Sequence, residues 1–360
     1  MKILIIGEYS GVGLNLCKGF KELGAKCEVI SYGDGRKRIK DSLCKIYNIG
    51  SQENRKILRY INIVMSGLRF FFFQKKKGFD VVFIMNECFI KEKYSILKPY
   101  MTMNLIKKSK KAILLACGDN YIYQKHFDEM KKNCHLKVND QILDRYKIEY
   151  ERVINDIDGI IPFSYDYYLG FFNESEYTKK KLLPPSFFPL KIEKNIEILN
   201  NYDPIIILHG YRKNTAKGSE IIEQALLELE KKYKGIIKVI ISKDLIPYNE
   251  WMKMIEASTI VVDQCNSYGS GMNALIALSM GKIVLSGNEI ENQQYMYGVK
   301  SPIINIQNSV ENIIDKIENL IINRNMLNDI RKQGIKYINE YHDCNIVAKT
   351  IIKNIYEHNK

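Results

Sequence analysis

The sequence lacks long hydrophobic runs. Its apolar stretches, such as Val81–Met85 and residues 205–208, are far shorter than the roughly 20 residues that a membrane-spanning helix needs. The N-terminus has only four apolar residues in a row before Gly7 and Glu8, which is too short for a signal peptide. We therefore expect a cytoplasmic protein. Its 360 residues, 46% of them hydrophobic, suffice for two domains with a core each.

Paired cysteine motifs are also missing. The eight cysteines show no CxxC spacing and no regular order, which is typical of reduced thiols. Cys134 stands beside His135 and near His126, but a structural zinc site needs four convergent ligands, and the sequence does not supply the others. We expect no metal and no cofactor.

Acidic residues are outnumbered, since 54 Lys and Arg residues against 41 Asp and Glu residues give a net charge of +13. This excess favours nucleic acid, anionic lipid or nucleotide phosphates as partners. The basic residues are scattered and no helix-turn-helix motif accompanies them, so we expect no nucleic-acid binding. From Arg69 to Lys77, four phenylalanines stand beside four cations, which would suit an anionic membrane surface. The alternative is a helix end that packs these phenylalanines into the core before a basic turn.

Short apolar runs alternate with longer amphipathic segments in both halves, as in βαβ units around a parallel sheet. In the first half, the expected strands are residues 2–6, 26–30, 80–84, 111–116 and 159–162. In the second half, they are residues 204–208, 236–241, 259–262 and 282–285, with helices at 219–232, 249–257 and 272–280. From residue 310 the pattern is helical to the end, with one break near residues 341–344.

Between the halves, Pro184, Pro185 and Pro189 interrupt this alternation. We predict an N-terminal domain over residues 1–185, a linker over 186–203, a second domain over 204–342, and a C-terminal helix over 343–360 that packs back on the first domain. The predicted fold class is α/β, with two Rossmann-like, doubly wound parallel-sheet domains facing a cleft. Ligands of such sheets bind at the carboxyl ends of the strands, so the site residues are expected in the loops there.

The first loop of the second half combines Gly210, Arg212 and Lys217 ahead of a helix that starts near Gly218. Two cations and a helix N-terminus converge there, which is the chemistry of a diphosphate site. The spacing differs from that of a P-loop, and a solvated basic loop is the alternative interpretation.

A second loop, residues 263–271, is rich in glycine and leads into the helix at 272–280. Glycine lets the backbone approach a ligand closely, and the first N–H groups of a helix have no partner within it. Together the two loops offer two anion-accepting helix ends to the two phosphates of a nucleoside diphosphate. The residues predicted to bind the donor in this loop are Ser267, Gly269, Ser270, Gly271, Met272 and Asn273.

The segment ending in ALSMGKIVLSG resembles the core motif of group 1 glycosyltransferases of the GT-B fold, in which Glu-Gly-Phe-Gly is followed after four residues by Glu-Ala-x-Ala-x-Gly-Lys-Pro-Val. Arg212, Lys217 and Gly218 are similar to that family's GR....KG element, which binds the donor diphosphate. FDVVFIMNE, YERVINDIDGIIPFS and KKLLPPSFFPL resemble further segments of the family. The resemblance implies a glycosyltransferase that moves a sugar from a nucleotide-activated donor to a saccharide or lipid-linked acceptor, in surface polysaccharide or glycan assembly.

Two glutamates of the family motif are absent. Aligned on Gly271 and Gly281, they fall on Tyr268 and Ile276, whereas in the family they contact the donor sugar and the ribose. This leaves a second hypothesis open, that the chain is a catalytically inactive relative that binds a glycan or a partner protein.

Other polar residues stand near the two vacant positions: Asp263, Asn266, Ser267 and Asn273. Glu289 follows the next strand, and we predict that it points into the same cleft with a catalytic role. A helix N-terminal acid that stabilises the helix dipole is the alternative.

The loops of the first half supply the other side of the cleft. The loop after residues 2–6 has the spacing GxxxGxG, which is not a dinucleotide fingerprint. By the resemblance it helps to close the acceptor site, with Glu8, Ser10 and Gly11 on the acceptor side. Asp119 follows the strand at 111–116 and is the second predicted catalytic residue, as a base toward an acceptor hydroxyl or a stabiliser of positive charge. A turn aspartate is its alternative.

Overall fold

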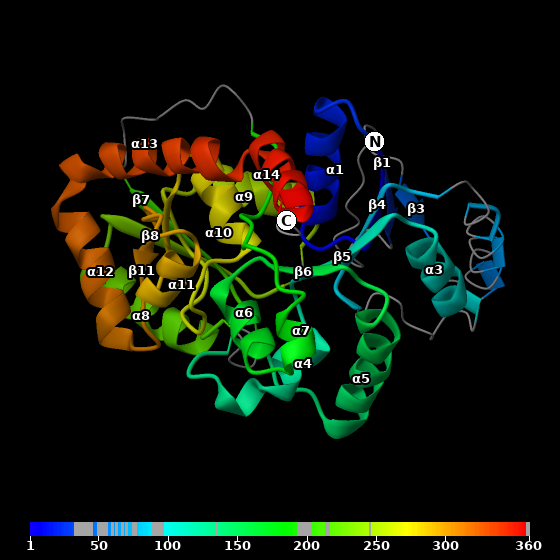
Figure 1. Ribbon diagram of the computed structural model, residues 1–360. Coiled ribbons are helices and arrows are strands. Elements are labelled where there is room, and N and C mark those ends of the chain that lie inside the picture. The colour runs from blue at the N-terminus through cyan, green and yellow to red at the C-terminus, as the bar shows by residue number, and fades with distance from the viewer. Residues whose placement is uncertain are drawn as a thin grey trace.

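The computed structural model describes residues 1–31, 46–48, 57–58, 61, 64–65, 68, 71–73, 78–87, 97–133, 135–192, 204–212, 217–244 and 246–357. These residues form two sheets that lie side by side, with helices packed around them (Figure 1). No helix in these ranges has the length and the apolar character required to cross a bilayer.

The N-terminal sheet has six parallel strands. Their order is β3 (Ile46–Asn48), β2 (Lys26–Ser31), β1 (Lys2–Ile6), β4 (Val81–Met85), β5 (Lys111–Ala116) and β6 (Gly159–Pro162). Its helices are α1 (Val12–Glu22), α3 (Leu97–Lys107), α4 (Tyr121–Lys125), α5 (Asp140–Ile154), α6 (Tyr165–Phe172) and α7 (Glu176–Lys179), with a 3-10 turn at Phe127–Glu129. All five residues of β4 are buried, because helices cover both faces of a parallel sheet, and this explains its continuous apolar run.

The C-terminal sheet has five parallel strands. Their order is β11 (Ile304–Asn305), β10 (Ile283–Ser286), β9 (Ile260–Val262), β7 (Ile205–Gly210) and β8 (Ile237–Ser242). Its helices are α8 (Ser219–Lys232), α9 (Tyr248–Ala257), α10 (Met272–Ser279), α11 (Ile290–Tyr295), α12 (Val310–Ile322) and α13 (Leu327–Tyr337), with a 3-10 turn at Arg324–Met326.

The first strand of each sheet is an inner strand, and later strands are added first on one side of it and then on the other. The prediction of an α/β protein with two doubly wound parallel sheets is therefore confirmed. Strands β3 and β11 were not predicted, because three and two residues are too few to give a recognisable pattern.

The chain crosses between the halves twice, and the two crossings lie side by side. The first passes through Leu190, and residues 193–203 of the predicted linker lie outside the described ranges. The second is a π-helix at Ile338–His342, after which α14 (Cys344–Glu357) begins. The Leu190 N–H donates to the His342 carbonyl (2.7 Å), and the Cys344 N–H donates to the Leu190 carbonyl (2.9 Å).

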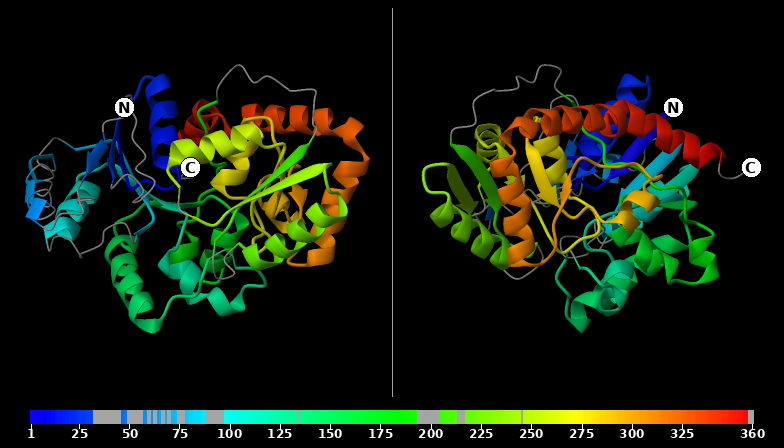
Figure 2. Two further views of the ribbon diagram at one scale, coloured as in Figure 1. Left: turned by 180° about the vertical axis from the view of Figure 1, so that it is seen from behind. Right: turned by 90° about the vertical axis from the view of Figure 1, so that its left-hand side faces the viewer.

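Helix α14 packs against α1 of the N-terminal half, as Figures 1 and 2 show. The two helices approach so closely at Gly19 that a Cβ there would lie 2.0 Å from the Cys344 carbonyl oxygen. One hydrophobic core continues from the α1 side of the N-terminal sheet through α14 to α10 of the C-terminal half. The halves are thus joined by a shared core as well as by the chain.

Candidate functional site

A cavity of about 550 Å³ opens between the two halves, at the carboxyl ends of the strands. The C-terminal half contributes most of its wall, from the loops that follow β7, β8 and β9. The N-terminal half contributes Ser10 from the loop after β1, Asp119 from the loop after β5, and His135 with Leu136 from the segment before α5.

The loop after β7 is held by a chain of hydrogen bonds that starts at a buried histidine. The His209 Nδ1 lies 2.8 Å from the Val262 carbonyl of β9, so Nδ1 donates and Nε2 accepts from the Ser219 hydroxyl at 3.0 Å. The Ser219 Oγ in turn accepts from the Arg212 N–H at 3.0 Å. Burial lowers the pKa of His209 to about 4, and this keeps the ring neutral, as the bonding pattern requires. The backbone of Arg212 is therefore fixed at the cavity wall.

Arg212 and Lys217 line the cavity, but they differ in their partners. The Lys217 ammonium donates to Asp263 Oδ1 at 2.6 Å, and both side chains are largely buried. The Arg212 guanidinium is exposed, and no carboxylate in the described ranges pairs with it. Arg212 is thus the cation that is available to an anionic ligand, while Lys217 already shares its charge with Asp263.

The start of α10 faces the same cavity. Gly271, Met272 and Asn273 line it, and no side chain caps the helix at Gly271. The first N–H groups of a helix have no intrahelical acceptor and carry partial positive charge, so this helix start can bind an anion. The structure thus brings four of the predicted loop elements together: Gly210, Arg212, Lys217 and the start of α10.

Ser267, Gly269 and Ser270 do not line this cavity. Ser267 is buried, and its hydroxyl accepts from Gln264 Nε2 at 2.7 Å and donates to the Gly269 carbonyl. The Tyr268 and Gly269 N–H groups donate to the buried carboxylate of Asp166 from α6, at 3.1 and 3.3 Å. This half of the glycine loop therefore connects the two halves of the molecule, and the donor-binding role predicted for Ser267, Gly269 and Ser270 stays a prediction.

Aromatic residues near β8 also line the cavity, and the sequence analysis missed them. Tyr211, Tyr248 and Trp251 stand on this side together with Ile246. Gly210 packs so closely on the indole that a Cβ there would lie 2.9 Å from Trp251. The one signal in the sequence was that Trp251 is the only tryptophan of the chain.

Asp119 lines the same cavity as Arg212 but comes from the other half of the molecule, and His135 is its partner. The two are joined at 3.3 Å between His135 Nδ1 and Asp119 Oδ1, while His135 Nε2 lies 3.2 Å from the Tyr167 hydroxyl. Gln124, which is buried, holds Asp119 Oδ1 at 3.1 Å and the Leu136 carbonyl at 2.9 Å. A carboxylate and an imidazole are thereby fixed at the wall of the cavity. His135 was missed as a site residue because it follows no strand.

Glu8 and Gly11 do not lie at the cavity, in contrast to Ser10. The Glu8 carboxylate turns inward and accepts from the Gly11 N–H at 2.6 Å and the Leu14 N–H at 2.7 Å. It thus satisfies N–H groups at the start of α1, for which a carboxylate is well suited. The Glu8 carboxylate thus caps α1, and the acceptor-side role of Glu8 and Gly11 stays a prediction.

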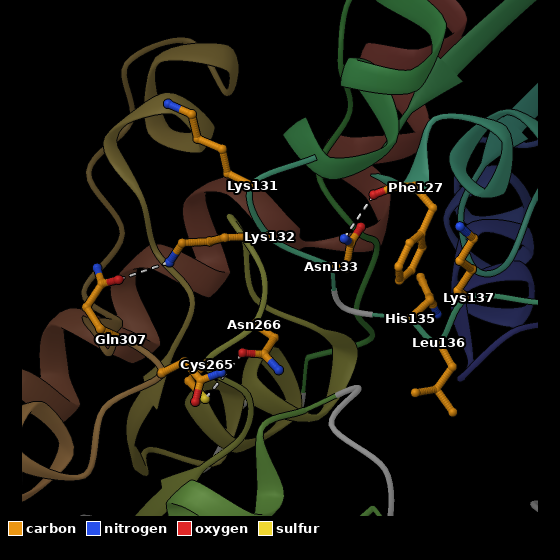
Figure 3. Close-up of a pocket in the computed structure, with 11 residues that line it drawn as sticks. Phe127, Lys131, Lys132, Asn133, His135, Leu136, Lys137, Cys265, Asn266 and Gln307 are labelled. Atoms are coloured by element: carbon orange, nitrogen blue, oxygen red, sulfur yellow. Dashed lines mark hydrogen bonds between the residues drawn. The ribbon is translucent and has the colours of Figure 1, made fainter. Parts of the chain in front are cut away.

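A second cavity of about 600 Å³ adjoins the first, with His135 and Leu136 in the walls of both (Figure 3). Lysines and amides dominate its lining: Lys131, Lys132, Lys137, Asn133, Asn266, Gln307 and Asn308. Figure 3 shows Lys132 extended toward Gln307, and the two are 3.3 Å apart between Nζ and Oε1.

Glu289 is the partner of Lys132 in an ion pair between the two halves. Burial raises the pKa of its carboxyl, but hydrogen bonds from Lys132, Asn305 and Gln307 outweigh this and lower it overall. Glu289 does not line the 550 Å³ cavity. Glu289 thus forms an interdomain contact, and its predicted catalytic role stays a prediction.

His126 also lies away from the cavity, between the carboxylates of Glu129 (2.9 Å) and Glu174 (2.8 Å). Cys134 lies outside the described residues. In the part of the chain that the structure describes, no three His, Cys, Asp or Glu side chains are grouped so that they could hold a metal ion.

Comparisons with known proteins agree on the fold and on nothing narrower. No family model and no curated protein matches the sequence. Solved structures do match over nearly the whole chain. Sucrose-phosphate synthase from Thermosynechococcus elongatus has a TM-score of 0.62 at 10% identity, covering 99% of each chain. The HepE protein of Anabaena in complex with UDP-glucose has a TM-score of 0.60 at 12% identity, covering 99% of this chain and 100% of that one.

This chain has the GT-B fold. A putative UDP-N-acetylglucosamine 2-epimerase from Listeria monocytogenes also matches, with a TM-score of 0.54 at 12% identity, covering 100% of this chain and 96% of that one. A shared fold therefore does not identify the reaction, and the function has to be argued from the site. In this GT-B chain, the cavity that holds Arg212, Lys217 and Asp119 lies between the two domains.

Proposed function

We propose that this protein is a glycosyltransferase that moves a sugar from a nucleotide-activated donor to a saccharide or lipid-linked acceptor, in surface polysaccharide or glycan assembly. One observation carries the proposal: the same interdomain cavity is lined by Arg212 and the start of α10 from one domain and by Asp119 and His135 from the other. Groups suited to bind an anion and groups suited to accept a proton thus line one cavity. The HepE protein of Anabaena, a structural neighbour, has been solved in complex with UDP-glucose and with UDP, which supports the same class of donor.

In this proposal the donor lies along the wall of the C-terminal domain. The Arg212 guanidinium and the N–H groups at the start of α10 bind the diphosphate, and Tyr248 and Trp251 pack on the base. These donors stabilise the negative charge that develops when the bond between the anomeric carbon and the phosphate oxygen breaks. No metal or cofactor is part of the proposal, because Arg212 and the helix start supply this charge.

The acceptor is proposed to enter from the side of Ser10, Asp119 and His135. Its hydroxyl oxygen forms the new bond to the anomeric carbon, and its proton passes to the carboxylate–imidazole pair. The nucleoside diphosphate leaves with the electron pair of the broken bond. Charge and proton are then balanced within the cavity.

The proposal predicts that Arg212→Ala weakens the binding of a nucleoside diphosphate. Losing a hydrogen bond to a charged group costs about 1.5–3 kcal/mol, which corresponds to a tenfold to hundredfold weaker Kd. Calorimetry with UDP and GDP measures this, and Arg145→Ala on the exposed face of α5 is the control that removes the same charge without effect. If the wild-type protein binds no nucleoside diphosphate, the proposed function is wrong.

A second candidate is a catalytically inactive relative that binds a glycan or a partner protein. The observation in its favour is that Lys217 is already neutralised by Asp263, and that apolar Ile276 lines the cavity where the resembling family has a glutamate. Nucleotide binding without hydrolysis or transfer over a panel of sugar donors would favour this candidate.

Membrane contact through the stretch from Arg69 to Lys77 stays a prediction. Arg69, Phe70 and residues 74–77 lie outside the described ranges. Of the described phenylalanines, Phe71 and Phe72 are exposed and Phe73 is buried. Cytoplasmic location likewise stays a proposal.

A further inference from the structure

Among the described residues, a carboxylate oxygen in the main cavity has no hydrogen-bond donor. Asp263 follows β9 and is 3% exposed, and its Oδ1 accepts from Lys217 at 2.6 Å. Its Oδ2 is buried, and no residue in the described ranges donates a hydrogen bond to it. Leaving a buried charged oxygen without a donor is costly, so a side chain kept in this arrangement at a ligand cavity points to a donor on the ligand.

A second acceptor lies next to this oxygen. Gln264 also lines the cavity, and its Nε2 donates to Ser267 Oγ at 2.7 Å and to the Gly269 carbonyl at 3.3 Å. These two bonds fix the orientation of the amide, so its Oε1 is left as an acceptor. Both acceptors flank Gly271: a Cβ there would lie 3.3 Å from Asp263 Oδ2 and 3.7 Å from Gln264 Oε1.

The pair of acceptors selects the chemistry of what binds. A phosphate offers no proton at neutral pH and would be repelled by the Asp263 carboxylate, whereas neighbouring hydroxyl groups of a sugar ring offer two hydrogen-bond donors. Glycine at position 271 keeps the space between the two acceptors open, because any side chain would start within van der Waals distance of both. The Arg212 guanidinium and the start of α10 line the same cavity and remain available to the phosphates.

We propose that Asp263 and Gln264 form a subsite for the hydroxyl groups of the sugar in the donor. The proposal rests on the proposed function, and it names the residues that do the work of the two family glutamates, whose positions here hold Tyr268 and Ile276. Two sugars of a nucleotide sugar carry such hydroxyls, the ribose and the transferred sugar. The subsite recognises neighbouring hydroxyl groups, which both sugars carry. The ligands used in the experiment distinguish the ribose from the transferred sugar.

The decisive variant is Asp263→Asn, because it acts with opposite sign on two parts of the ligand. Removing the negative charge of Asp263 ends its ion pair with Lys217, so the Lys217 ammonium becomes available to the diphosphate. The affinity for 2′-deoxy-UDP, which lacks the 2′-hydroxyl, is therefore expected to rise a few-fold. The sugar hydroxyl then no longer has a charged acceptor, which weakens the recognition of that hydroxyl about tenfold. A residue that only held Lys217 in place would change the affinity for all ligands by the same factor.

The experiment measures Kd by calorimetry for UDP, 2′-deoxy-UDP and UDP-glucose. If the subsite binds ribose, the wild-type preference for UDP over 2′-deoxy-UDP falls about tenfold in Asp263→Asn. If it binds the transferred sugar, the preference for UDP-glucose over UDP falls instead. Gln264→Ala should reduce the same preference without the gain in diphosphate affinity, and it serves as the second variant if Asp263→Asn does not fold.

Asp244→Asn is the matched control, because Asp244 is an exposed carboxylate that lines the same cavity. It should leave both preferences unchanged. The subsite alone would be overturned if UDP still binds but neither the preference for UDP over 2′-deoxy-UDP nor that for UDP-glucose over UDP changes in Asp263→Asn and Gln264→Ala. Absence of UDP and GDP binding in the wild type would overturn the proposed function, and the subsite with it.

Discussion

Asp263 and Glu87 are both buried carboxylates with one oxygen bonded and the other without a partner. They differ in what surrounds them. Asp263 lines a cavity beside a lysine, whereas Glu87 is fully enclosed and accepts a hydrogen bond from the Tyr121 N–H at 2.6 Å. Burial raises the pKa of Glu87 to about 7, against the opposing effect of that bond. The Glu87 carboxylate therefore affects the stability of the fold, whereas the Asp263 carboxylate is placed to bind a ligand.

We predict that Glu87→Gln stabilises the protein at alkaline pH. The folded pKa of about 7 lies above the ordinary value of 4.5, so the folded state binds the proton more tightly and wild-type stability falls as the pH rises from 4.5 to 7. The glutamine keeps the bond to Tyr121 and carries no charge. Its gain at pH 8 is up to about 3 kcal/mol in the free energy of unfolding, from about 1.4 kcal/mol per unit of pKa.

Urea unfolding at pH 5 and pH 8 measures this effect. Glu87→Gln should exceed wild type in free energy of unfolding by a small amount at pH 5 and by a large amount at pH 8. Glu151→Gln on the exposed face of α5 is the control, since an exposed ion pair such as that of Glu151 with Lys147 contributes about 0–1 kcal/mol. An equal effect of Glu87→Gln at both pH values would contradict the prediction.

Single residues show why side-chain roles were harder to predict than positions. Asp119 and Arg212 line the cavity and occur in loops that follow strands, where the sequence analysis expected site residues. Glu8 occurs in an equally suitable loop, yet its carboxylate turns back to the start of α1. The direction of a short side chain depends on the nearest unsatisfied N–H groups, and these are known only once the helix start is placed.

Elements could be predicted where burial makes their pattern strong. Strands such as β1 and β4 are apolar at nearly every position because both faces of the sheet are covered. The glycine loop before α10 shows the limit of this approach. Its two ends look alike in sequence, but residues 268–269 bind Asp166 while residues 271–273 line the cavity. Only the position of α6 separates the two roles.

At the level of helices, we predict that Gly19→Ala detaches α14 from α1. The added Cβ would lie 2.0 Å from a backbone oxygen of Cys344, and a backbone atom cannot move aside without shifting α14. Overpacking of this kind costs about 1–3 kcal/mol, and more where the backbone must move. Chemical unfolding measures the loss, and hydrogen exchange locates it, with faster exchange expected in α14.

Gly24→Ala is the comparison for this variant. A Cβ at Gly24 would meet no atom within 4 Å, but the residue has a φ of 81°, so this change costs only conformational strain of about 1 kcal/mol. Exchange in α14 should be unaffected. Unchanged exchange of α14 in Gly19→Ala would show that the contact between the two helices is not maintained in solution.

For the whole molecule, several bonds hold the two domains against each other. The Asp166 carboxylate binds the loop before α10, Lys132 pairs with Glu289, and the Tyr165 N–H donates to Asn292 at 3.1 Å. His342 lies where the chain crosses back, with Nδ1 donating to the Phe188 carbonyl at 2.8 Å and Nε2 buried without a partner. Burial lowers the pKa of His342 to about 4.

We predict that this histidine makes the junction sensitive to acid. Its folded pKa lies below the ordinary 6.5, so the unfolded state binds more protons and stability falls as the pH drops from about 6.5 to 4. Between pH 7.5 and pH 4.5, wild type should lose about 2–3 kcal/mol more in free energy of unfolding than His342→Asn does. The opposite effect of Glu87 in the same range is present in both proteins and cancels in this difference.

Urea unfolding of both proteins at pH 7.5, 5.5 and 4.5 tests the prediction. His342→Asn is expected to be less stable at pH 7.5, because it loses the contact of the ring with Phe187. The difference in free energy of unfolding between wild type and His342→Asn should then become smaller at each lower pH. If this difference does not depend on pH, His342 is not held neutral in the folded state.

The sequence by itself determined the two parallel sheets, their order along the chain and the loops in which site residues occur, because these depend on local periodicity and on glycine, which the sequence shows directly. The tertiary structure alone decided which side chains meet. His135 joins Asp119, Trp251 packs on Gly210, and Asp263 keeps one oxygen free beside Gly271, across separations of many residues. Such contacts between side chains depend on how helices and strands pack, which no short stretch of sequence encodes.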